Sequence, residues 1–242
     1  MSSATWTRSD LPEGGRRFAD RRDAGRRLAR LLERVRGERE GGWEGGLPIV
    51  VGIARGGLPV AAEIARSLGA PLDVVVVRKI GAPMNPEYGI GALAEGGAEV
   101  VSERAVEALN IAPEQLRELI SRARAELVRR LARYRGGRGP LPVAGRTVIL
   151  VDDGLATGRT AQVAARSLRR RDAARVILAI PVAAPGSAAE LREEVDEVVC
   201  VEMPPNLRAI GFWYEDFRPT SDEEVAALLG GAAPPGPGEL GR

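Results

Sequence analysis

Two adjacent carboxylates, Asp152 and Asp153, mark the place where residue types and spacing most clearly indicate chemistry. They follow residues 147–151, an apolar, β-branched run of the kind that forms strands. Residues 154–160 come next, a loop of small and hydroxyl residues that leads into a predicted helix. Backbone N–H groups, hydroxyls and a helix N-terminus at one point bind phosphate, whereas carboxylates bind hydroxyls or reach a metal ion. The pattern predicts a phosphate site with two acids at its edge; a capped helix after an acidic turn is the plainer alternative.

The same stretch, Val151 to Thr160, resembles the signature of the type I phosphoribosyltransferases, which bind 5-phosphoribosyl 1-diphosphate (PRPP). That signature has two acids at a strand end, two or three variable residues, then Thr-Gly and a further hydroxyl residue. The resemblance implies that the acids hold the ribose hydroxyls and that the loop holds the 5′-phosphate. The loop residues assigned in this way are Gly154, Leu155, Ala156, Thr157, Gly158, Arg159 and Thr160.

A second unit of strand, turn and helix precedes this motif. Residues 48–54 are a continuous apolar run of the type buried in parallel sheets, and a helix is predicted over 58–68. Arg55, Gly56 and Gly57 lie between them. Arginine pairs with anions and glycine permits close approach of the backbone to a ligand, although two glycines at such a turn are also ordinary packing. The resemblance implies that this loop binds the diphosphate of PRPP.

Lys79 is the single lysine among the 35 basic residues and follows Arg78, after a strand predicted over 72–77. Residues 80–97 are rich in glycine, which predicts a long irregular loop. The resemblance implies that a mobile loop here closes over PRPP and that Lys79 or Arg78 is its cation; retention of one lysine by chance is the alternative. Residues 89–94 also match a dinucleotide-binding pattern, which we discount because no predicted strand leads into them.

Four of the nine aromatic residues fall between positions 212 and 217, after the last predicted strand. They indicate either a small hydrophobic cluster or a stacking wall for a planar ligand. The segment is similar to the base-binding hood of the 6-oxopurine phosphoribosyltransferases, which implies that Glu215 lies near magnesium. The base contacts implied in the same way are Arg208, Ile210, Phe212 and Trp213.

Two positions depart from the 6-oxopurine pattern. Arg208 stands where those enzymes usually place the aromatic residue that stacks on the base. Ala156 stands where they carry an Asp that is a proposed general base. The sequence Ala-Thr-Gly at this point is nearer to the adenine and uracil enzymes, so the acceptor stays open.

The composition excludes several kinds of site. There is no histidine and one cysteine, Cys200, which rules out His-based acid/base catalysis, His- or Cys-rich zinc sites and an internal disulfide. No apolar run approaches the ~18 residues of a membrane span, and residues 1–12 lack the apolar centre of a signal peptide. We therefore expect a cytoplasmic protein that is not inserted in a membrane. The arginines of residues 16–30 are interrupted by acids, which favours a solvated helix face over a nucleic-acid surface.

The alternation of strands and helices predicts an α/β fold, a parallel sheet flanked by helices on both faces with a small hood. Residues 16–231 are expected to be a single domain, with its core at about 48–201 and the hood from 16–46 and 202–231. Residues 1–15 are expected to be a flexible arm and residues 232–242 a disordered tail. The other predicted helices are 18–35, 113–135, 158–171, 187–195 and 222–229, and the other strands are 99–101, 174–182 and 197–201.

In such a sheet ligands bind at the carboxyl ends of the strands, where Arg55, Lys79 and Asp152 would all fall. The resemblance therefore implies transfer of the phosphoribosyl group of Mg-PRPP to a nitrogen of a small nucleobase-like acceptor, with release of diphosphate and with Mg²⁺ held through PRPP. Asp152, Asp153 and Lys79 are the catalytic candidates. A non-catalytic PRPP or nucleotide sensor and a nucleotide hydrolase are the alternatives. The helix at 113–135 would pack on the sheet or on a second subunit, which leaves a homodimer open.

Overall fold

The main sheet is built from six strands in the described part of the chain, all of them parallel, in the order β1-β9-β8-β7-β2-β3. The structure is a computed structural model and describes residues 5–8, 17–37, 43–86 and 88–231. The strands are β1 Thr5–Arg8, β2 Ile49–Ile53, β3 Leu72–Val75, β7 Thr147–Val151, β8 Arg175–Val182 and β9 Glu197–Glu202. Strands β2 and β7 are buried along their whole length, as expected for strands covered on both faces.

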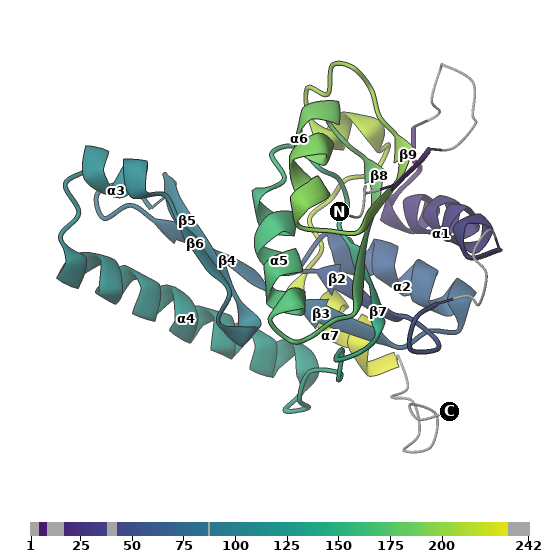
Figure 1. Cartoon of the computed structure of the whole chain (residues 1–242), viewed down its shortest axis with the longest axis horizontal. Coiled ribbons are helices and arrows are strands. Elements are labelled where there is room, and N and C mark those ends of the chain that lie inside the picture. Colours follow the sequence, from purple (N-terminus) through teal and green to yellow (C-terminus); the bar gives the residue numbers. More distant parts are fainter. Residues whose placement is uncertain (1–4, 9–16, 38–42, 87, 232–242) are drawn as a thin grey trace.

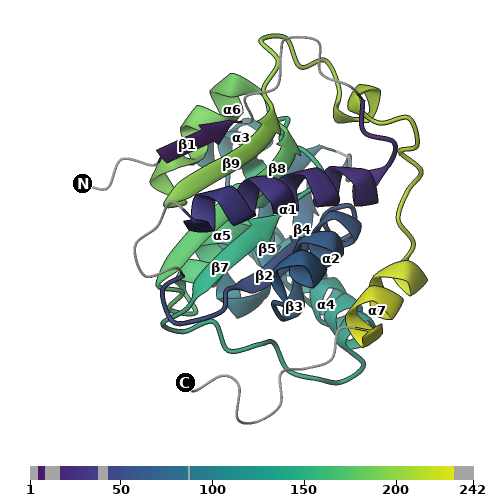
Figure 2. The ribbon, with the colours of Figure 1, turned by 90° about the vertical axis from the view of Figure 1, so that its right-hand side faces the viewer.

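Helices cover the two faces of this sheet and form a separate apolar cluster on each. On one face α1 (Arg21–Gly37) and α2 (Gly57–Leu68) pack together, with Leu28 and Ile64 in their shared cluster (Figure 2). On the other face lie α5 (Arg159–Arg169) and α6 (Pro185–Glu190), with Val163 and Ala188 in the second cluster. The predicted α/β fold with a parallel sheet between helices is therefore confirmed.

The expectation of a flexible arm over residues 1–15 is wrong for Thr5–Arg8. These residues form β1, which pairs with Glu197–Cys200 of β9 at the edge of the main sheet. An edge strand offers unpaired backbone groups, and this short segment pairs with them. The rest of residues 1–15 and the predicted tail at 232–242 lie outside the described residues.

A second sheet projects from the core as an arm (Figure 1). It contains β4 (Val77–Gly81), β5 (Gly89–Ala94) and β6 (Glu99–Val101), paired antiparallel, and it carries α3 (Glu103–Ala108) and α4 (Pro113–Arg135). The strand at 99–101 agrees with the prediction from the sequence. The prediction of a long irregular loop over residues 80–97 is wrong, because this stretch includes strand β5. Pairing on both sides of β5 outweighs the poor strand propensity of its glycines. At Gly91 a Cβ atom would lie 2.5 Å from the carbonyl oxygen of Val100, so that close pairing requires glycine.

The hood brings together the segment before α1 and the segment after β9. Phe18 donates its backbone N–H to the carbonyl of Trp213 at 2.8 Å, and its own carbonyl accepts from the N–H of Glu215 at 2.8 Å. The short 3₁₀ helix η3 (Ile210–Trp213) lies within the C-terminal part of this hood, and α7 (Asp222–Gly231) follows it. The remaining 3₁₀ turns are η1 (Glu95–Gly97) and η2 (Leu191–Glu193). No helix of the described residues is both long and apolar enough to cross a membrane.

Candidate functional site

The two acids lie at the carboxyl end of β7, against the glycine loop that follows the neighbouring strand β2. A Cβ atom on Gly56 would lie 2.1 Å from Oδ2 of Asp153, and one on Gly57 would lie 3.0 Å from the Cα of Asp152. Gly56 thus faces the Asp153 carboxylate and Gly57 faces the backbone at the end of β7, whereas the sequence suggested only that these glycines let a ligand approach. The contact brings the predicted diphosphate loop and the predicted ribose acids into one site.

Burial makes both carboxyl groups harder to ionise than exposed ones. The pKa of Asp152 is well above its usual range, first because the group is buried and second because the charge of Asp153 lies beside it. Burial also raises the pKa of Asp153, while the neighbouring guanidinium of Arg21 opposes that rise. The two groups form an acid pair with unequal partners, and Asp153 is the member that has a cation.

Two hood residues that the sequence did not single out as site residues hold Asp153. The Nε of Arg21 donates to Oδ2 of Asp153 at 2.8 Å, and the hydroxyl of Tyr214 donates to the backbone carbonyl of Asp153 at 2.6 Å. Arg21 lies in a stretch of similar arginines, so nothing in the sequence distinguished it. Tyr214 belongs to the aromatic group at 212–217, which was a usable signal for the segment but not for the residue.

The loop predicted to hold the 5′-phosphate is fixed at its start and open at its end. The N–H of Leu155 donates to the carbonyl of Val182 at 2.8 Å, and the side chain of Ser187 donates to the carbonyl of Ala156. Ala156, Thr157 and Arg159 are exposed, while Gly154 and Leu155 are buried, and Gly158 and Thr160 are half-buried. Within the described residues the N–H groups of 156–160 donate to no protein acceptor. This is the arrangement of donors that a phosphate at a helix N-terminus needs.

Gly158 allows this loop to turn into α5. Its φ of 72° lies in the left-handed region that glycine adopts without steric cost. At the other end of the loop, a Cβ atom on Gly154 would lie 2.5 Å from the side chain of Ile210 in the hood. Ile210, a predicted base contact, therefore packs directly on the phosphate loop.

The predicted diphosphate loop begins with a cis peptide bond between Ala54 and Arg55. The Arg55 guanidinium is half exposed and lies 3.6 Å from Oδ1 of Asp222, at the start of α7. It is thus a partly available cation next to Gly56 in the chain. This arrangement suits an anion that arrives from solvent.

The arm holds the two predicted lid cations away from any direct pairing with the acids. Lys79 is exposed and Arg78 is half-buried, and both lie in β4, not in a loop. Within the described residues no ion pair joins either side chain to Asp152 or Asp153. The roles predicted for both remain predictions.

The other predicted hood residues are distributed unevenly. Phe212 and Arg208 are exposed, whereas Trp213 packs partly against the core. Tyr214 and Phe217 stack with ring centroids 4.9 Å apart, so the aromatic group is partly a hydrophobic cluster, as one reading of the sequence held. Glu215 has an exposed side chain, and its role near magnesium remains a prediction.

The described residues contain no group of three or more His, Cys, Asp or Glu side chains arranged to hold a metal ion. A magnesium ion often binds through one or two carboxylates together with substrate phosphates. Binding of Mg²⁺ through PRPP remains a prediction.

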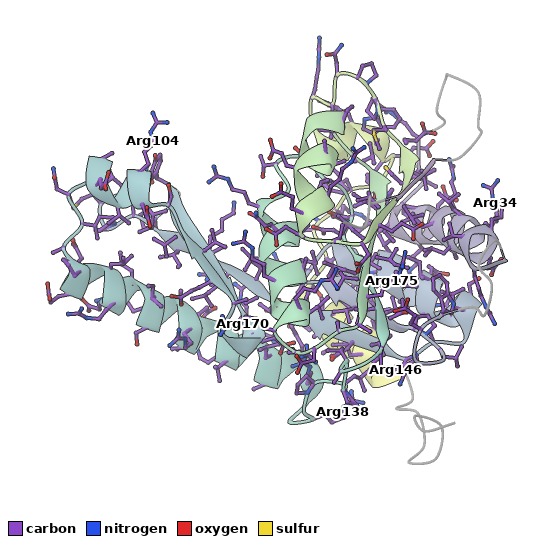
Figure 3. The ribbon with its side chains drawn as sticks, in the orientation of Figure 1. Arg34, Arg104, Arg138, Arg146, Arg170 and Arg175 are labelled. Atoms are coloured by element: carbon purple, nitrogen blue, oxygen red, sulfur yellow. The ribbon has the colours of Figure 1, made fainter. Side chains whose placement is uncertain are left out.

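Many arginines of the described residues form ion pairs with acids, and they come from several elements. Arg34 on α1 and Arg104 on α3 lie at opposite ends of the molecule (Figure 3), and α4 pairs its own arginines with acids, as in Arg122 with Glu118. The expectation that the protein does not bind nucleic acid remains a prediction.

The sequence of this chain matches the model of one protein family. The model of the phosphoribosyl transferase domain matches residues 17–216. A crystal structure of the protein TT1426 from Thermus thermophilus is 41% identical, with a TM-score of 0.73, and the match covers 90% of this chain and 100% of that one. Two versions of a Mycobacterium tuberculosis protein, from strains CDC 1551 and H37Rv, are 41% identical over 88% of this chain; they are named as phosphoribosyl transferases of unconfirmed activity. The match covers 46% of those two proteins, so the chain spans about half their length.

Proposed function

Because this chain belongs to the phosphoribosyl transferase family, we propose that it transfers the phosphoribosyl group of Mg-PRPP to a nitrogen of a nucleobase-like acceptor and releases diphosphate. The contact between Asp153 and Gly56 carries this proposal. It joins a loop suited to diphosphate, an acid pair suited to ribose hydroxyls and a loop suited to the 5′-phosphate along one sheet edge. PRPP carries these three groups in the same molecule.

Each part of the site has a role in this proposal. Arg55 and the N–H groups of its loop bind the diphosphate, and the N–H groups of 156–160 bind the 5′-phosphate. Asp152 and Asp153 accept hydrogen bonds from the ribose hydroxyls and stabilise positive charge that develops on the ring as the bond at C1 breaks. Lys79 or Arg78 reaches the diphosphate when the arm moves toward it. Mg²⁺, when bound with PRPP, neutralises charge on the leaving diphosphate.

The proposal assigns the binding of the acceptor base to the hood and to no other part of the chain. A pocket of about 440 Å³ next to Arg21 is lined by none of the four predicted base contacts. It includes Arg22, Asp216 and the buried Thr220, and its lining is strongly polar.

A cytoplasmic location and a nucleobase as acceptor belong to the proposal as well.

The decisive experiment replaces both acids, as Asp152→Asn with Asp153→Asn. We expect Mg-PRPP binding, measured by titration calorimetry, to weaken at least about a hundredfold, because two hydrogen bonds to charged groups are worth roughly 1.5–3 kcal/mol each. Release of diphosphate in a screen of nucleobases should fall below detection. The matched control is Asp172→Asn, which changes an exposed acid in a left-handed turn that asparagine also adopts.

Unchanged PRPP affinity in the double variant, with the control also unchanged, would show that this site assignment is wrong. Binding of Mg-PRPP by the wild-type protein without diphosphate release for any base would instead favour a PRPP sensor. Release of a base from a nucleotide without PRPP would identify a hydrolase.

A further inference from the structure

We propose that Arg21 is a positioning residue for the acid pair: its guanidinium holds the Asp153 carboxylate between the hood and the diphosphate loop, ready for the ribose of the substrate. This inference rests on the proposed function, since it assumes that Asp153 meets a ribose hydroxyl. It concerns a residue that lies outside the two loops and the acid motif.

The guanidinium group of Arg21 makes three contacts. Its Nε donates to Oδ2 of Asp153 at 2.8 Å, and its Nη1 donates to the backbone carbonyl of Arg218 at 2.7 Å. Its Cζ lies 4.0 Å from the centre of the Phe217 ring, which is a cation–π geometry. The side chains of Arg21 and Asp153 are only 11% and 14% exposed, so solvent screens this pair little. A lysine could supply the charge but not two donors fixed in one plane.

Oδ2 of Asp153 is enclosed from two sides. Arg21 donates to it from the hood, and Gly56 of the diphosphate loop is so close that a Cβ atom would lie 2.1 Å away. A carboxylate oxygen has room for more than one donor. The contact with Arg21 therefore fixes the group and leaves acceptor capacity for a substrate hydroxyl.

The hood backbone sets the place of Arg21. The chain before α1 and the chain around Tyr214 are joined by a parallel bridge, and Asp216 donates its N–H to the carbonyl of Ala19 at 2.9 Å. Arg21 is the first residue of α1, two positions beyond this contact. Tyr214, from the same junction, donates to the backbone of Asp153. The two hood segments thus hold the side chain and the main chain of one acid together.

The pairing also favours the ionised form of Asp153. Three charged or titratable groups face it: Asp152 from its own strand end, Arg21 from α1 and Tyr214 from the hood. Burial raises the pKa of Asp153, and Arg21 opposes that rise. Without Arg21 a larger fraction of Asp153 would be protonated near neutral pH and could no longer accept from a hydroxyl with its full charge.

The test compares Arg21→Gln and Arg21→Lys with Arg30→Gln, a change of an exposed arginine on the same helix. Mg-PRPP affinity is measured by titration calorimetry between pH 6 and 9, and folding is followed by thermal unfolding. We expect Arg21→Gln to weaken Mg-PRPP binding about tenfold at pH 7. As the pH rises, the affinity of this variant should approach that of the wild type, because Asp153 is then ionised again. Arg21→Lys should lose less at pH 7, and Arg30→Gln should match the wild type throughout.

An Arg21→Gln defect of equal size at every pH, or no defect, would overturn the inference, because a merely structural role does not follow the ionisation of Asp153. If the glutamine variant does not fold, equal binding by the lysine variant and the wild type at every pH would have the same meaning. Asp153→Asn, measured in parallel, distinguishes a failure of the role proposed for Arg21 from a failure of the proposed site. Loss of binding in Asp153→Asn with full binding in Arg21→Gln refutes the role of Arg21 alone, whereas full binding in Asp153→Asn refutes the proposed site itself.

Discussion

At the scale of residues, glycine at three loop positions is dictated by what lies beside it. Gly56 faces the Asp153 carboxylate, Gly57 faces the β7 backbone, and Gly154 faces Ile210. At each position a Cβ atom would come within 2.5 Å of its neighbour. Gly56 has a φ of −61°, which any residue can adopt, so its requirement is purely steric. The loops of the site are therefore packed against one another before any ligand binds.

Gly56→Ala tests this steric requirement. The added methyl group must displace the Asp153 side chain, which would separate it from Arg21, and overpacking of this kind costs about 1–3 kcal/mol. We expect Mg-PRPP affinity to fall about tenfold or more, measured by calorimetry, with a small decrease in Tm. Gly230→Ala is the control, because no atom lies within 4 Å of the Cβ position there. Equal affinities of the two variants would contradict a direct contact between the loop and the acid.

At the scale of elements, one buried arginine fastens the arm to the core. Arg135, at the end of α4, donates from Nε to Asp73 of β3 at 2.9 Å and from Nη1 to Glu95 of η1 at 2.6 Å. A further bond joins its Nη2 to the backbone of Val74 at 2.8 Å. All three charged groups are less than 10% exposed. The arm that carries Lys79 is thus tied to the main sheet through a buried charge network.

Arg135→Met should therefore be strongly destabilising. Removal of the cation leaves two buried carboxylates without their main partner, which costs about 3–5 kcal/mol in comparable cases. Urea denaturation gives the free energy of unfolding. Arg122→Met is the control, because Arg122 and Glu118 form an exposed pair worth about 0–1 kcal/mol. A loss below about 1 kcal/mol in Arg135→Met would show that the network does not hold the arm.

At the scale of the whole molecule, α7 connects the diphosphate loop to the arm. Asp222 accepts a hydrogen bond from the Tyr134 hydroxyl at 2.6 Å and lies 3.2 Å from Arg133, both on α4. The same carboxylate lies 3.6 Å from Arg55. Helix α4 packs on α7 and on β4 and β5 of the arm. The sheet that it covers is therefore the antiparallel sheet of the arm, whereas the prediction concerned the parallel sheet, and a homodimer remains a proposal.

The contact between α4 and α7 predicts an alkaline loss of stability. Burial, followed by the hydrogen bond to Asp222, raises the pKa of Tyr134 to about 12. Because an unfolded tyrosine ionises near pH 10, the stabilisation is complete below pH 10 and is lost as the pH rises toward 12. Thermal unfolding should show a steeper fall in Tm over this range for the wild type than for Tyr134→Phe. Tyr88→Phe, at an exposed site, should keep the wild-type slope; equal slopes in all three proteins would contradict the assignment.

The sequence by itself determined the parts of the site that are local along the chain. A strand end, two acids, a small-residue loop and a helix start occupy consecutive positions, so the acid pair and the proposed phosphate loop could be located before the fold was known. The same holds for Arg55 and its glycines. The parallel arrangement then follows from alternating strands and helices, and it places both loops at one edge.

Only the tertiary structure decided what touches Asp153 and what shape the arm takes. Arg21 is 132 positions away from Asp153 and Tyr214 is 61 positions away, so no local pattern joins them. The glycines of β5 predict a loop when considered alone, and their pairing with two neighbouring strands makes them a sheet. Long-range contacts of this kind depend on which backbones meet in three dimensions, and that is set by the packing of the whole chain.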